Sequence, residues 1–414
     1  MHAFAEHIRI YSIKPVDIID MGKYKTQIAI IGGGITGLWL INLLRSQGYK
    51  ALLFEKTALG GEQTFASQGM IHGGLKYALG GMTTPASESI ANMPKVWRSC
   101  LAGTGEVDLS GLDILSEDYF LFSDAALTSK VTAFFASKSL EARISTLERK
   151  DFTGIFDSPK FKGLLYRLQD IVLDTPALVN KLLSNYRDYI FHCEPKVLLK
   201  SKKIVGLQLN QNDILEADQY IFTAGAGNEN LLKNTCLDNI TMQRRPLQQV
   251  MVKGKLPKIY AHAVSLKSTN KPRVTFTSHP SDDEETVWYL GGNLAEQGAG
   301  KTAEQVIQDA KKELATLLPW VDLTKATWAT LNVDRAEPSQ LLKSRPDFPF
   351  VESKDNAIVC WPTKLTLCPM LGEDVLQTIE NINLAKVSGE NETIPDLPLA
   401  RVAKTPWEIA FDPS

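Results

Sequence analysis

Cysteine is scarce in this sequence, and no two cysteines lie close together. Their spacing includes no Cys-x-x-Cys pair, and their number is odd; they are Cys100, Cys193, Cys236, Cys360 and Cys368. This pattern argues against a disulfide framework and against a structural zinc site, so we predict no bound metal. Simple thiols suit a reducing compartment, which predicts a cytoplasmic protein.

An excess of charge of either sign is also absent. The 414 residues include 45 Lys and Arg against 47 Asp and Glu, for a net charge of −2. We therefore expect no general attraction to nucleic acid or acidic lipid. The longest apolar run, residues 28–44, is interrupted by four glycines and two polar residues. We predict no transmembrane segment, while peripheral contact with the inner face of a membrane stays open.

A glycine-rich turn stands between an apolar strand and a helix near the N-terminus. Residues 27–31 predict a buried strand, residues 38–47 a helix that ends at Gly48, and residues 51–54 a second strand that ends at Glu55. The turn has the pattern Gly-x-Gly-x-x-Gly at Gly32, Gly34 and Gly37. Glycines here admit a pyrophosphate to the helix N-terminus, and the acid can accept hydrogen bonds from ribose. The order predicts dinucleotide binding, but it does not separate FAD from NAD.

A second glycine-rich segment follows and contains one histidine. Residues 67–81 read SQGMIHGGLKYALGG, with five glycines and His72. Glycine is costly inside a helix, at about 1 kcal/mol per residue, so this segment is not an ordinary helix. Together with residues 55–66 it resembles FAD enzymes of the D-amino-acid oxidase superfamily. The nearest likeness is to the glycerol-3-phosphate dehydrogenase and L-2-hydroxyglutarate dehydrogenase branches.

The resemblance implies an α/β fold with two domains. A Rossmann-like FAD-binding domain with a central parallel sheet is expected from residues 25–90, 151–240 and 335–390. A second, mostly antiparallel sheet with helices is expected from residues 91–150 and 241–334. Residues 1–24 would be an N-terminal extension, and residues 391–414 a C-terminal tail.

The resemblance also implies a set of residues that contact FAD. In relatives the glycine–histidine segment lies along the flavin, where bare backbone can approach a flat ring. The implied contacts are Gly32, Gly34, Ile35, Thr36, Gly37, Glu55, Lys56, Thr64, Ser67, Gln68, Gly69, Met70, Ile71, Val197, Ala224, Gly225, Lys364, Leu365 and Thr366.

A smaller set is expected at the substrate. His72, Arg335 and Lys364 are the catalytic candidates, because a histidine can act as a base and cations can stabilise negative charge. Many relatives carry Gly-His-Gly in the loop that here reads WPTKLT, from Trp361 to Thr366. The candidates for substrate binding are Arg244, Arg245, Tyr289 and Arg345.

The expected function is oxidation of a small molecule by hydride transfer to flavin N5. The substrate would be a hydroxy acid, a polyol phosphate or an amino acid, and the electron acceptor oxygen, a quinone or a carrier protein. A flavoprotein that modifies tRNA, a flavin-binding assembly factor without turnover, and an NAD-dependent dehydrogenase stay open as alternatives.

Overall fold

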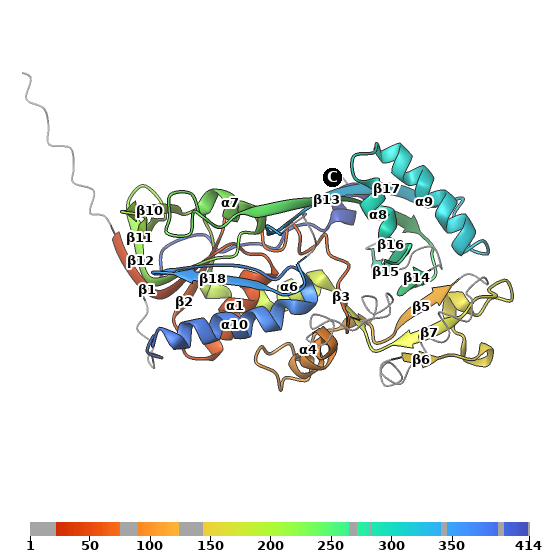
Figure 1. Cartoon of the computed structure of the whole chain (residues 1–414), viewed down its shortest axis with the longest axis horizontal. Coiled ribbons are helices and arrows are strands. Elements are labelled where there is room, and N and C mark those ends of the chain that lie inside the picture. Colours follow the sequence, from red (N-terminus) through yellow and green to blue (C-terminus); the bar gives the residue numbers. More distant parts are fainter. Residues whose placement is uncertain are drawn as a thin grey trace, which may run out of the picture.

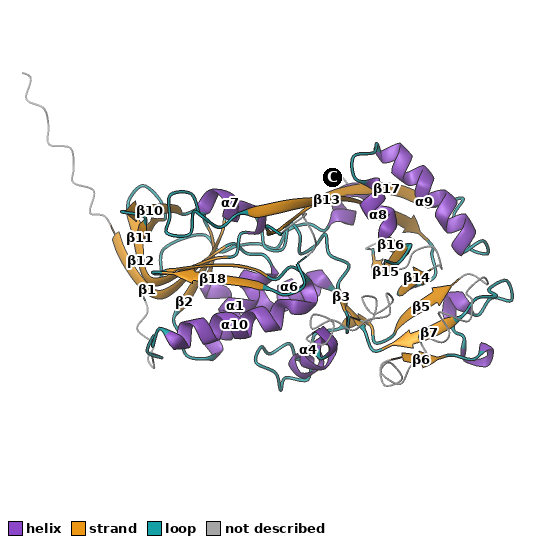
Figure 2. Ribbon diagram, in the orientation of Figure 1, coloured by secondary structure: helices purple, strands orange, loops and turns teal. Residues whose placement is uncertain are grey.

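The computed structural model describes residues 22–74, 90–123, 144–264, 271–281, 284–340, 346–387 and 393–412. Two large sheets lie side by side in the elongated molecule, one at each end of the view in Figure 1. Figure 2 shows that helices pack against both sheets. The strands β13 and β17 extend from the second sheet toward the first.

The first sheet is mostly parallel, as expected for the FAD-binding domain. Its main path runs β10-β11-β12-β1-β2-β9, with β19 beside β12 and β18 beside β19. The parallel strands are β1 (Gly22–Ile31), β2 (Ala51–Glu55), β9 (Ile190–His192), β12 (Asp213–Phe222) and β19 (Ala357–Trp361). The antiparallel strands are β10 (Lys196–Lys200), β11 (Lys203–Gln208) and β18 (Phe350–Lys354).

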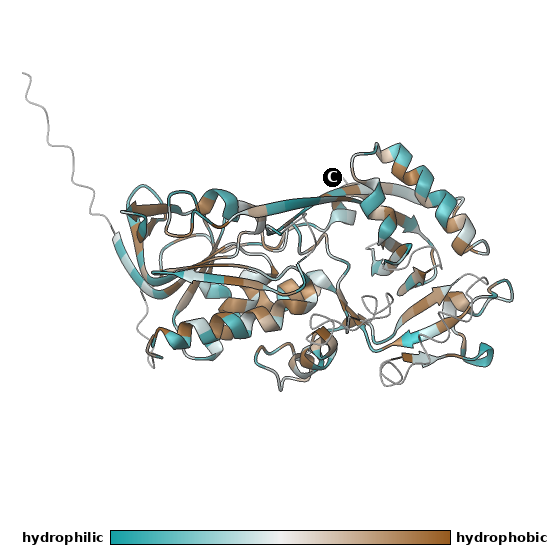
Figure 3. Ribbon diagram, viewed as in Figure 1, coloured by the Kyte–Doolittle hydropathy of each residue, from teal (hydrophilic) through white to brown (hydrophobic). Residues whose placement is uncertain are grey.

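Both faces of this sheet are buried. Ile28 and Ile30 of β1 join a core that includes α1 (Ile35–Ser46), α6 (Thr175–Asn185) and α10 (Cys368–Asn381). Ala29 and Ile31 point to a separate core on the other face, near α7 (Asn228–Leu231). This arrangement explains the near-continuous apolar sequence of β1. Figure 3 shows hydrophobic residues gathered along these strands and along α1.

The predicted helix after the glycine turn begins earlier in the structure than expected. The helix expected over residues 38–47 begins at Ile35 and ends at Ser46, with Gly48 in the left-handed region at φ +88°. The helix α10 begins at Cys368, because Pro369 is favourable in its first turn. Asp174 caps α6 by accepting a hydrogen bond from the Ala177 N–H at 3.3 Å.

The second sheet is antiparallel except where β14 runs parallel to β5. Its order is β17-β13-β16-β15-β14-β5-β7-β6. Its strands are β5 (Tyr119–Ser123), β6 (Ile144–Thr146), β7 (Leu165–Leu168), β13 (Met242–Gly254), β14 (Ala261–Val264), β15 (Val274–Pro280), β16 (Thr286–Gly291) and β17 (Thr327–Pro338).

The helices α8 (Asn293–Gly298) and α9 (Ala303–Leu317) accompany the second sheet. Val306, Ala310 and Leu314 of α9 join the core that includes Val250 and Trp288. The capping box at Thr302 and Gln305 fixes where α9 begins. The helices α8 and α9 therefore cover one face of this sheet. The first domain and the C-terminal residues lie against the other face.

The chain crosses between the two sheets more often than the segment boundaries predicted. The strand β7 pairs with β5 and β6 in the second sheet, although residues 151–240 were assigned to the first domain. Conversely, α4 (Met93–Leu101) buries Trp97 and Cys100 in the core of the first domain, although residues 91–150 were assigned to the second. A small third sheet of β3 (Met70–Ile71), β4 (Ile114–Ser116) and β8 (Ile171–Leu173) lies at these crossings.

Candidate functional site: a cavity between the two sheets

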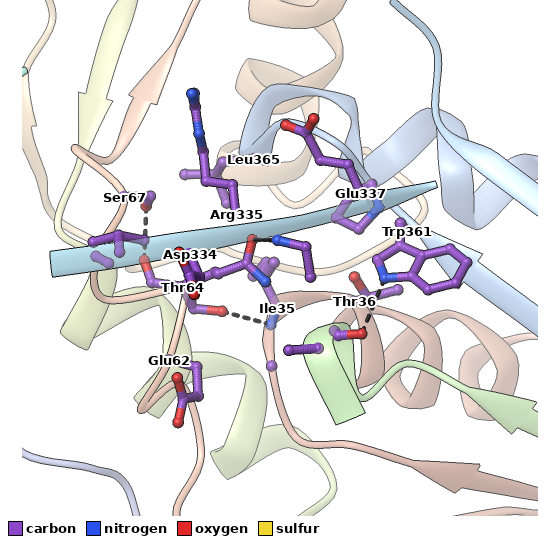
Figure 4. A pocket seen from close by; sticks show the side chains of 18 of the residues that line it. Ile35, Thr36, Glu62, Thr64, Ser67, Asp334, Arg335, Glu337, Trp361 and Leu365 are labelled. Atoms are coloured by element: carbon purple, nitrogen blue, oxygen red, sulfur yellow. Dashed lines mark hydrogen bonds between the residues drawn. The ribbon is translucent and has the colours of Figure 1, made fainter. Parts of the chain in front are cut away.

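One large cavity runs between the two sheets and has a volume of about 1090 Å³. This volume slightly exceeds the usual range for small-molecule sites, which is about 300–1,000 Å³. Most of the residues singled out from the sequence line it: Gly32, Gly34, Ile35, Thr36, Glu55, Lys56, Thr64, Ser67, Gln68, Gly69, Met70, His72, Ala224, Gly225, Arg244, Arg245, Arg335, Lys364, Leu365 and Thr366. Figure 4 shows part of this wall.

The three motif glycines have different structural roles. A Cβ on Gly32 would lie 2.6 Å from the Ala224 Cα, and one on Gly37 would lie 2.0 Å from the Gly32 carbonyl oxygen. Both glycines therefore allow close packing of the backbone, and Gly37 is not part of the cavity wall. Gly34 is in an extended conformation, and a Cβ there would meet only the Thr64 Oγ1 at 3.5 Å. The space beside Gly34 belongs to the cavity.

The end of the cavity near β2 carries hydrogen-bonding groups suited to a nucleotide. The Glu55 carboxylate accepts hydrogen bonds from the Gly33 N–H at 2.7 Å and from the Thr57 N–H at 2.8 Å. The N-terminus of α1 opens toward the same region, and the Ile35 N–H donates to the Thr64 Oγ1 at 2.9 Å (Figure 4). A helix N-terminus of this kind favours phosphate.

Val197 does not contribute to this end of the cavity. Its side chain packs against the core that contains Ala29 and Ile31 of β1. Cys193, Glu194 and Pro195, just before β10, line the cavity instead. Contact of FAD with the backbone at Val197 stays a prediction.

Three side chains attach the loop of residues 63–68 to the second sheet. The Gln63 Oε1 accepts from the Ala336 N–H at 3.0 Å. The Gln68 Nε2 donates to the Tyr289 carbonyl oxygen at 2.8 Å, and the Tyr289 hydroxyl donates to the Ala66 carbonyl oxygen at 3.1 Å. The loop is therefore held between both domains.

Two residues predicted to touch ligands lie away from the cavity. Ile71 is fully buried in the core of the first domain, because β3 turns its side chain inward. Tyr289 is also fully buried, with its hydroxyl occupied by Ala66 and by Gln249 at 2.7 Å. Tyr289 therefore supports the loop rather than forming the pocket wall, while its neighbours Gly291 and Gly292 line the cavity.

His72 is a buried residue whose backbone is held by Thr366. The His72 N–H donates to the Thr366 Oγ1 at 3.0 Å, and the same hydroxyl donates to the His72 carbonyl oxygen at 3.4 Å. The adjacent Gly73 N–H donates to the Asp170 carboxylate at 2.8 Å. These bonds join the glycine–histidine segment to the loop before α10 and fix His72 at the cavity wall.

Lys364 is only 7% exposed, so it does not face solvent. Its Nζ donates to the Asp347 carbonyl oxygen at 3.1 Å, and its backbone N–H donates to the Pro362 carbonyl oxygen at 2.7 Å. The backbone N–H of Lys364, an expected FAD contact, is thus engaged within the chain. Leu365 and Thr366 lie in a short 3₁₀ turn directly before α10, whose N-terminus has no side-chain cap.

Arginines of the second sheet meet on the cavity wall. Arg245 of β13 is directly opposite Arg335 of β17. Arg245 binds Glu337 through its Nε at 2.7 Å and its Nη2 at 3.3 Å, while the Arg335 Nη2 lies 3.7 Å from Glu296. Arg244 is half-exposed and pairs with Glu229 and Asp334. Arg345 lies outside the described residues.

Glu296 is a cavity residue that the sequence did not reveal. Burial alone would raise its pKa, but the hydrogen bond from Lys271 and the charges of Lys271, Arg335 and Arg245 lower the pKa below its usual range. Glu296 therefore stays ionised beside Arg335. Its partners come from segments far apart in the chain, so no local pattern indicated it; the same holds for Gln63, Gln249 and Glu337.

Two negative findings apply to the described part of the chain. None of its helices combines the length and apolarity that crossing a membrane requires. No group of three or more His, Cys, Asp or Glu side chains there comes together as a metal site.

The fold and the cavity define the class of protein. Three features fit a dinucleotide: a mostly parallel sheet, open space beside Gly34 in the glycine turn, and an acid at the end of the second strand. The rest of the cavity extends to the second sheet, where charged residues line it. The family model for FAD-dependent oxidoreductases of the DAO type matches residues 27–372. The chain belongs to this family and is an FAD-dependent oxidoreductase.

Individual relatives agree with this assignment. An FAD-dependent oxidoreductase of Pseudomonas aeruginosa is 44% identical over 389 residues, which cover 93% of this chain and 98% of the relative. Its crystal structure superposes with a TM-score of 0.80 at 39% identity, again over 93% and 98% of the two chains.

Two more distant structures share the fold. Glycine oxidase from Geobacillus kaustophilus has a TM-score of 0.60 at 15% identity, over 92% of this chain and 100% of that chain. L-α-glycerophosphate oxidase from Mycoplasma pneumoniae has a TM-score of 0.60 at 14% identity, over 89% and 97%. The family prediction is confirmed by the family model and the Pseudomonas relative, whereas the two branches named from the sequence remain a prediction.

Proposed function

We propose that this enzyme oxidises a small acidic molecule, with FAD lying along the cavity from Glu55 to the second sheet. The phosphates would lie at the N-terminus of α1, the ribose at Glu55, and the ring beside residues 67–72 and 364–366. When bound, FAD supplies a hydride acceptor at its N5 atom. The chain contributes binding, orientation and charge.

The paired arginines of the second sheet carry the proposal for the substrate. Arg245 and Arg335 share one face of the sheet at the cavity wall. A guanidinium group binds carboxylate or phosphate through parallel hydrogen bonds. A substrate with a carboxylate or phosphate group therefore suits this end of the cavity, which includes hydroxy acids, polyol phosphates and amino acids.

Arg335 is the better candidate of the two to receive the acidic group. Arg245 is committed to a close, two-bond contact with Glu337, and Glu337 is almost fully buried. Arg335 has a longer contact of 3.7 Å to Glu296. An acidic ligand that binds Arg335 leaves the buried Arg245–Glu337 pair intact, and breaking such a pair is costly.

Two further residues would act on the reacting groups. His72 lies at the cavity wall with its backbone fixed by Thr366. Its ring Nδ1 accepts a hydrogen bond from the Gly74 N–H at 3.3 Å, so the ring would orient a substrate through Nε2, or would accept a proton from a hydroxyl in place of this contact. Lys364 brings a buried positive charge to the loop before α10, where it would stabilise the negative charge that FAD acquires on reduction.

Family membership sets aside the NAD-dependent alternative and leaves the substrate and acceptor to be identified. We place the enzyme in the cytoplasm, in agreement with its five buried, free cysteines. Oxygen, a quinone and a carrier protein are the candidate acceptors.

The deciding experiment is the visible spectrum of the purified protein during anaerobic addition of small acids. We expect flavin absorption that is bleached by one hydroxy acid, polyol phosphate or amino acid and is restored by oxygen or a quinone. Bleaching only by uncharged compounds would contradict the role of the arginines. Binding of tRNA that weakens steeply with salt, without bleaching by any acid, would favour the tRNA-modifying alternative.

A further inference from the structure

The C-terminal residues extend along the first domain and then pack on the second sheet. Residues 398–400 follow the edge strand β9, where the His192 N–H donates to the Pro398 carbonyl oxygen at 2.7 Å. Residues 401–403 then bind the backbone of Leu59, whose N–H donates to the Arg401 carbonyl oxygen at 2.8 Å. The neighbours of Leu59, Ala58 and Gly60, line the cavity. We call residues 398–412 the C-terminal strap.

The strap ends in the helix α11 (Pro406–Phe411), which begins with a capping box of Thr405 and Glu408. Trp407 of this helix is 6% exposed. Its ring stacks on the His279 ring, with centroids 4.5 Å apart and planes 28° apart. It also meets the edge of the Tyr289 ring at 6.2 Å. The indole thus covers two side chains of the second sheet.

Hydrogen bonds connect both covered side chains, His279 and Tyr289, to the loop of residues 63–68. The Tyr289 hydroxyl donates to the Ala66 carbonyl oxygen, as described above. The His279 Nε2 lies 3.0 Å from the Thr277 Oγ1, and the Gln68 Nε2 donates to the same hydroxyl at 3.4 Å. Two short paths therefore join Trp407 to a loop that lines the cavity, although Trp407 itself is not part of the wall.

We propose that Trp407 is a positioning residue for the cofactor loop. Its ring holds His279 and Tyr289 in single orientations, and these hold Gln68 and Ala66 in register with the second sheet. Well-packed supporting residues keep a site within the narrow geometry that binding requires. FAD affinity should therefore depend on a C-terminal side chain outside the cavity. The inference rests on the proposed placing of the flavin against residues 67–72.

The test compares three variants by their dissociation constant for FAD, measured on FAD-free protein, and by the visible circular dichroism of the bound flavin. Trp407→Leu keeps an apolar side chain but removes the stacked ring. Trp407→Phe keeps a ring and should restore most of the affinity. Ile409→Ala is the matched control, because Ile409 is on the same helix and is 61% exposed.

We expect Trp407→Leu to raise the FAD dissociation constant by at least about tenfold, the scale on which loss of an orienting group weakens metal sites. The flavin circular dichroism should change with it, whereas Ile409→Ala should leave both unchanged. Thr277→Val breaks one path without altering α11, so it gives the same test if Trp407→Leu does not fold. Unchanged FAD affinity and spectrum in the folded variants would overturn the inference.

Gly34→Val in the same assay separates this inference from the proposed function. Loss of FAD by Gly34→Val together with unchanged binding by Trp407→Leu and Thr277→Val would refute only the role of Trp407. Full FAD binding by Gly34→Val would refute the placing of the cofactor itself.

Discussion

Arg245 and Arg335 lie directly opposite each other on neighbouring antiparallel strands, and both line the cavity. Like charges at directly opposed positions destabilise a sheet. Glu337 and Glu296 offset this repulsion in the protein without substrate. The pair therefore fits the anion binding that we propose, with little net effect on stability.

Arg335→Gln should separate these two effects. We expect kcat/KM for the acid that reduces the enzyme to fall by about 10- to 100-fold, because a hydrogen bond to a charged group contributes about 1.5–3 kcal/mol. The melting temperature should stay the same or rise, since one of two like charges is removed. Arg244→Gln is the control. Its effect should be smaller because Arg244 is half-exposed and already pairs with Glu229 and Asp334. A loss of kcat/KM no larger than that control would contradict the assignment.

The glycine turn allows binding and folding to be tested at different positions. Gly34→Val should abolish FAD binding while the FAD-free protein keeps its melting temperature, because Gly34 has an ordinary φ of −73° and its side chain would enter the cavity. Gly37→Ala should instead lower the melting temperature, because the new Cβ would meet the Gly32 carbonyl oxygen at 2.0 Å. Overpacking of this kind costs about 1–3 kcal/mol or more. Thermal melts and FAD titration of both variants check this.

The first strand, turn, helix and second strand could be predicted because their signals are local. The apolar run of β1, the glycines and Glu55 lie within thirty-odd residues, and each follows from backbone geometry. The bounds differed in two places: β1 begins at Gly22 rather than at residue 27, and α1 begins at Ile35 because Gly37 disfavours a helix prediction for its first turn.

The cavity wall differed from expectation where position depends on pairing between distant strands. Val197 and Tyr289 have the residue types expected of a site, but the register of β10 and β16 turns their side chains into cores. The missed residues Gln63 and Glu296 act through Ala336 and Arg335, which are far from them in sequence. Their roles depend on the second sheet, whose strand order the sequence pattern did not reveal.

His72 and Thr366 should affect flavin reduction together. His72→Ala should slow the anaerobic reduction of the flavin by about 10²–10⁴-fold if the ring accepts a proton. Thr366→Val removes the hydroxyl that joins both backbone groups of His72, and should cause a smaller loss of rate with weaker FAD binding. Stopped-flow reduction measures the first effect and FAD titration the second. If His72→Ala changes neither quantity, His72 is only part of the loop.

His279 should make stability depend on pH below neutrality. Burial lowers the pKa of His279 from 6.5 to about 3 in the folded protein. Between these values the unfolded chain binds a proton that the folded protein does not, so the free energy of unfolding should fall by about 1.4 kcal/mol per unit of decreasing pH. Above pH 6.5 the group is neutral in both states and contributes no dependence.

The His279→Gln variant isolates this contribution. Urea unfolding at several pH values should show a shallower dependence below neutrality than in the unaltered protein, whatever the absolute stability of the variant. Equal slopes would mean that His279 is protonated in the folded protein.

Lys364 should control the reduction potential of the flavin. Its ammonium group is buried at the cavity wall and donates to the Asp347 carbonyl oxygen. Lys364→Met keeps the length of the side chain but removes the charge, so negative charge on reduced FAD loses a stabilising partner. We expect the two-electron midpoint potential to fall by at least about 30 mV, which corresponds to about 1.4 kcal/mol.

Lys56→Met provides the matched control for this measurement. Lys56 also lines the cavity, but it is largely exposed and pairs with Glu194 near the end proposed for the nucleotide. Its replacement should leave the potential nearly unchanged, because solvent screens an exposed charge. Anaerobic titration with a reference dye distinguishes the two variants. Equal shifts would mean that Lys364 acts only through the total charge of the cavity and does not lie beside the flavin ring.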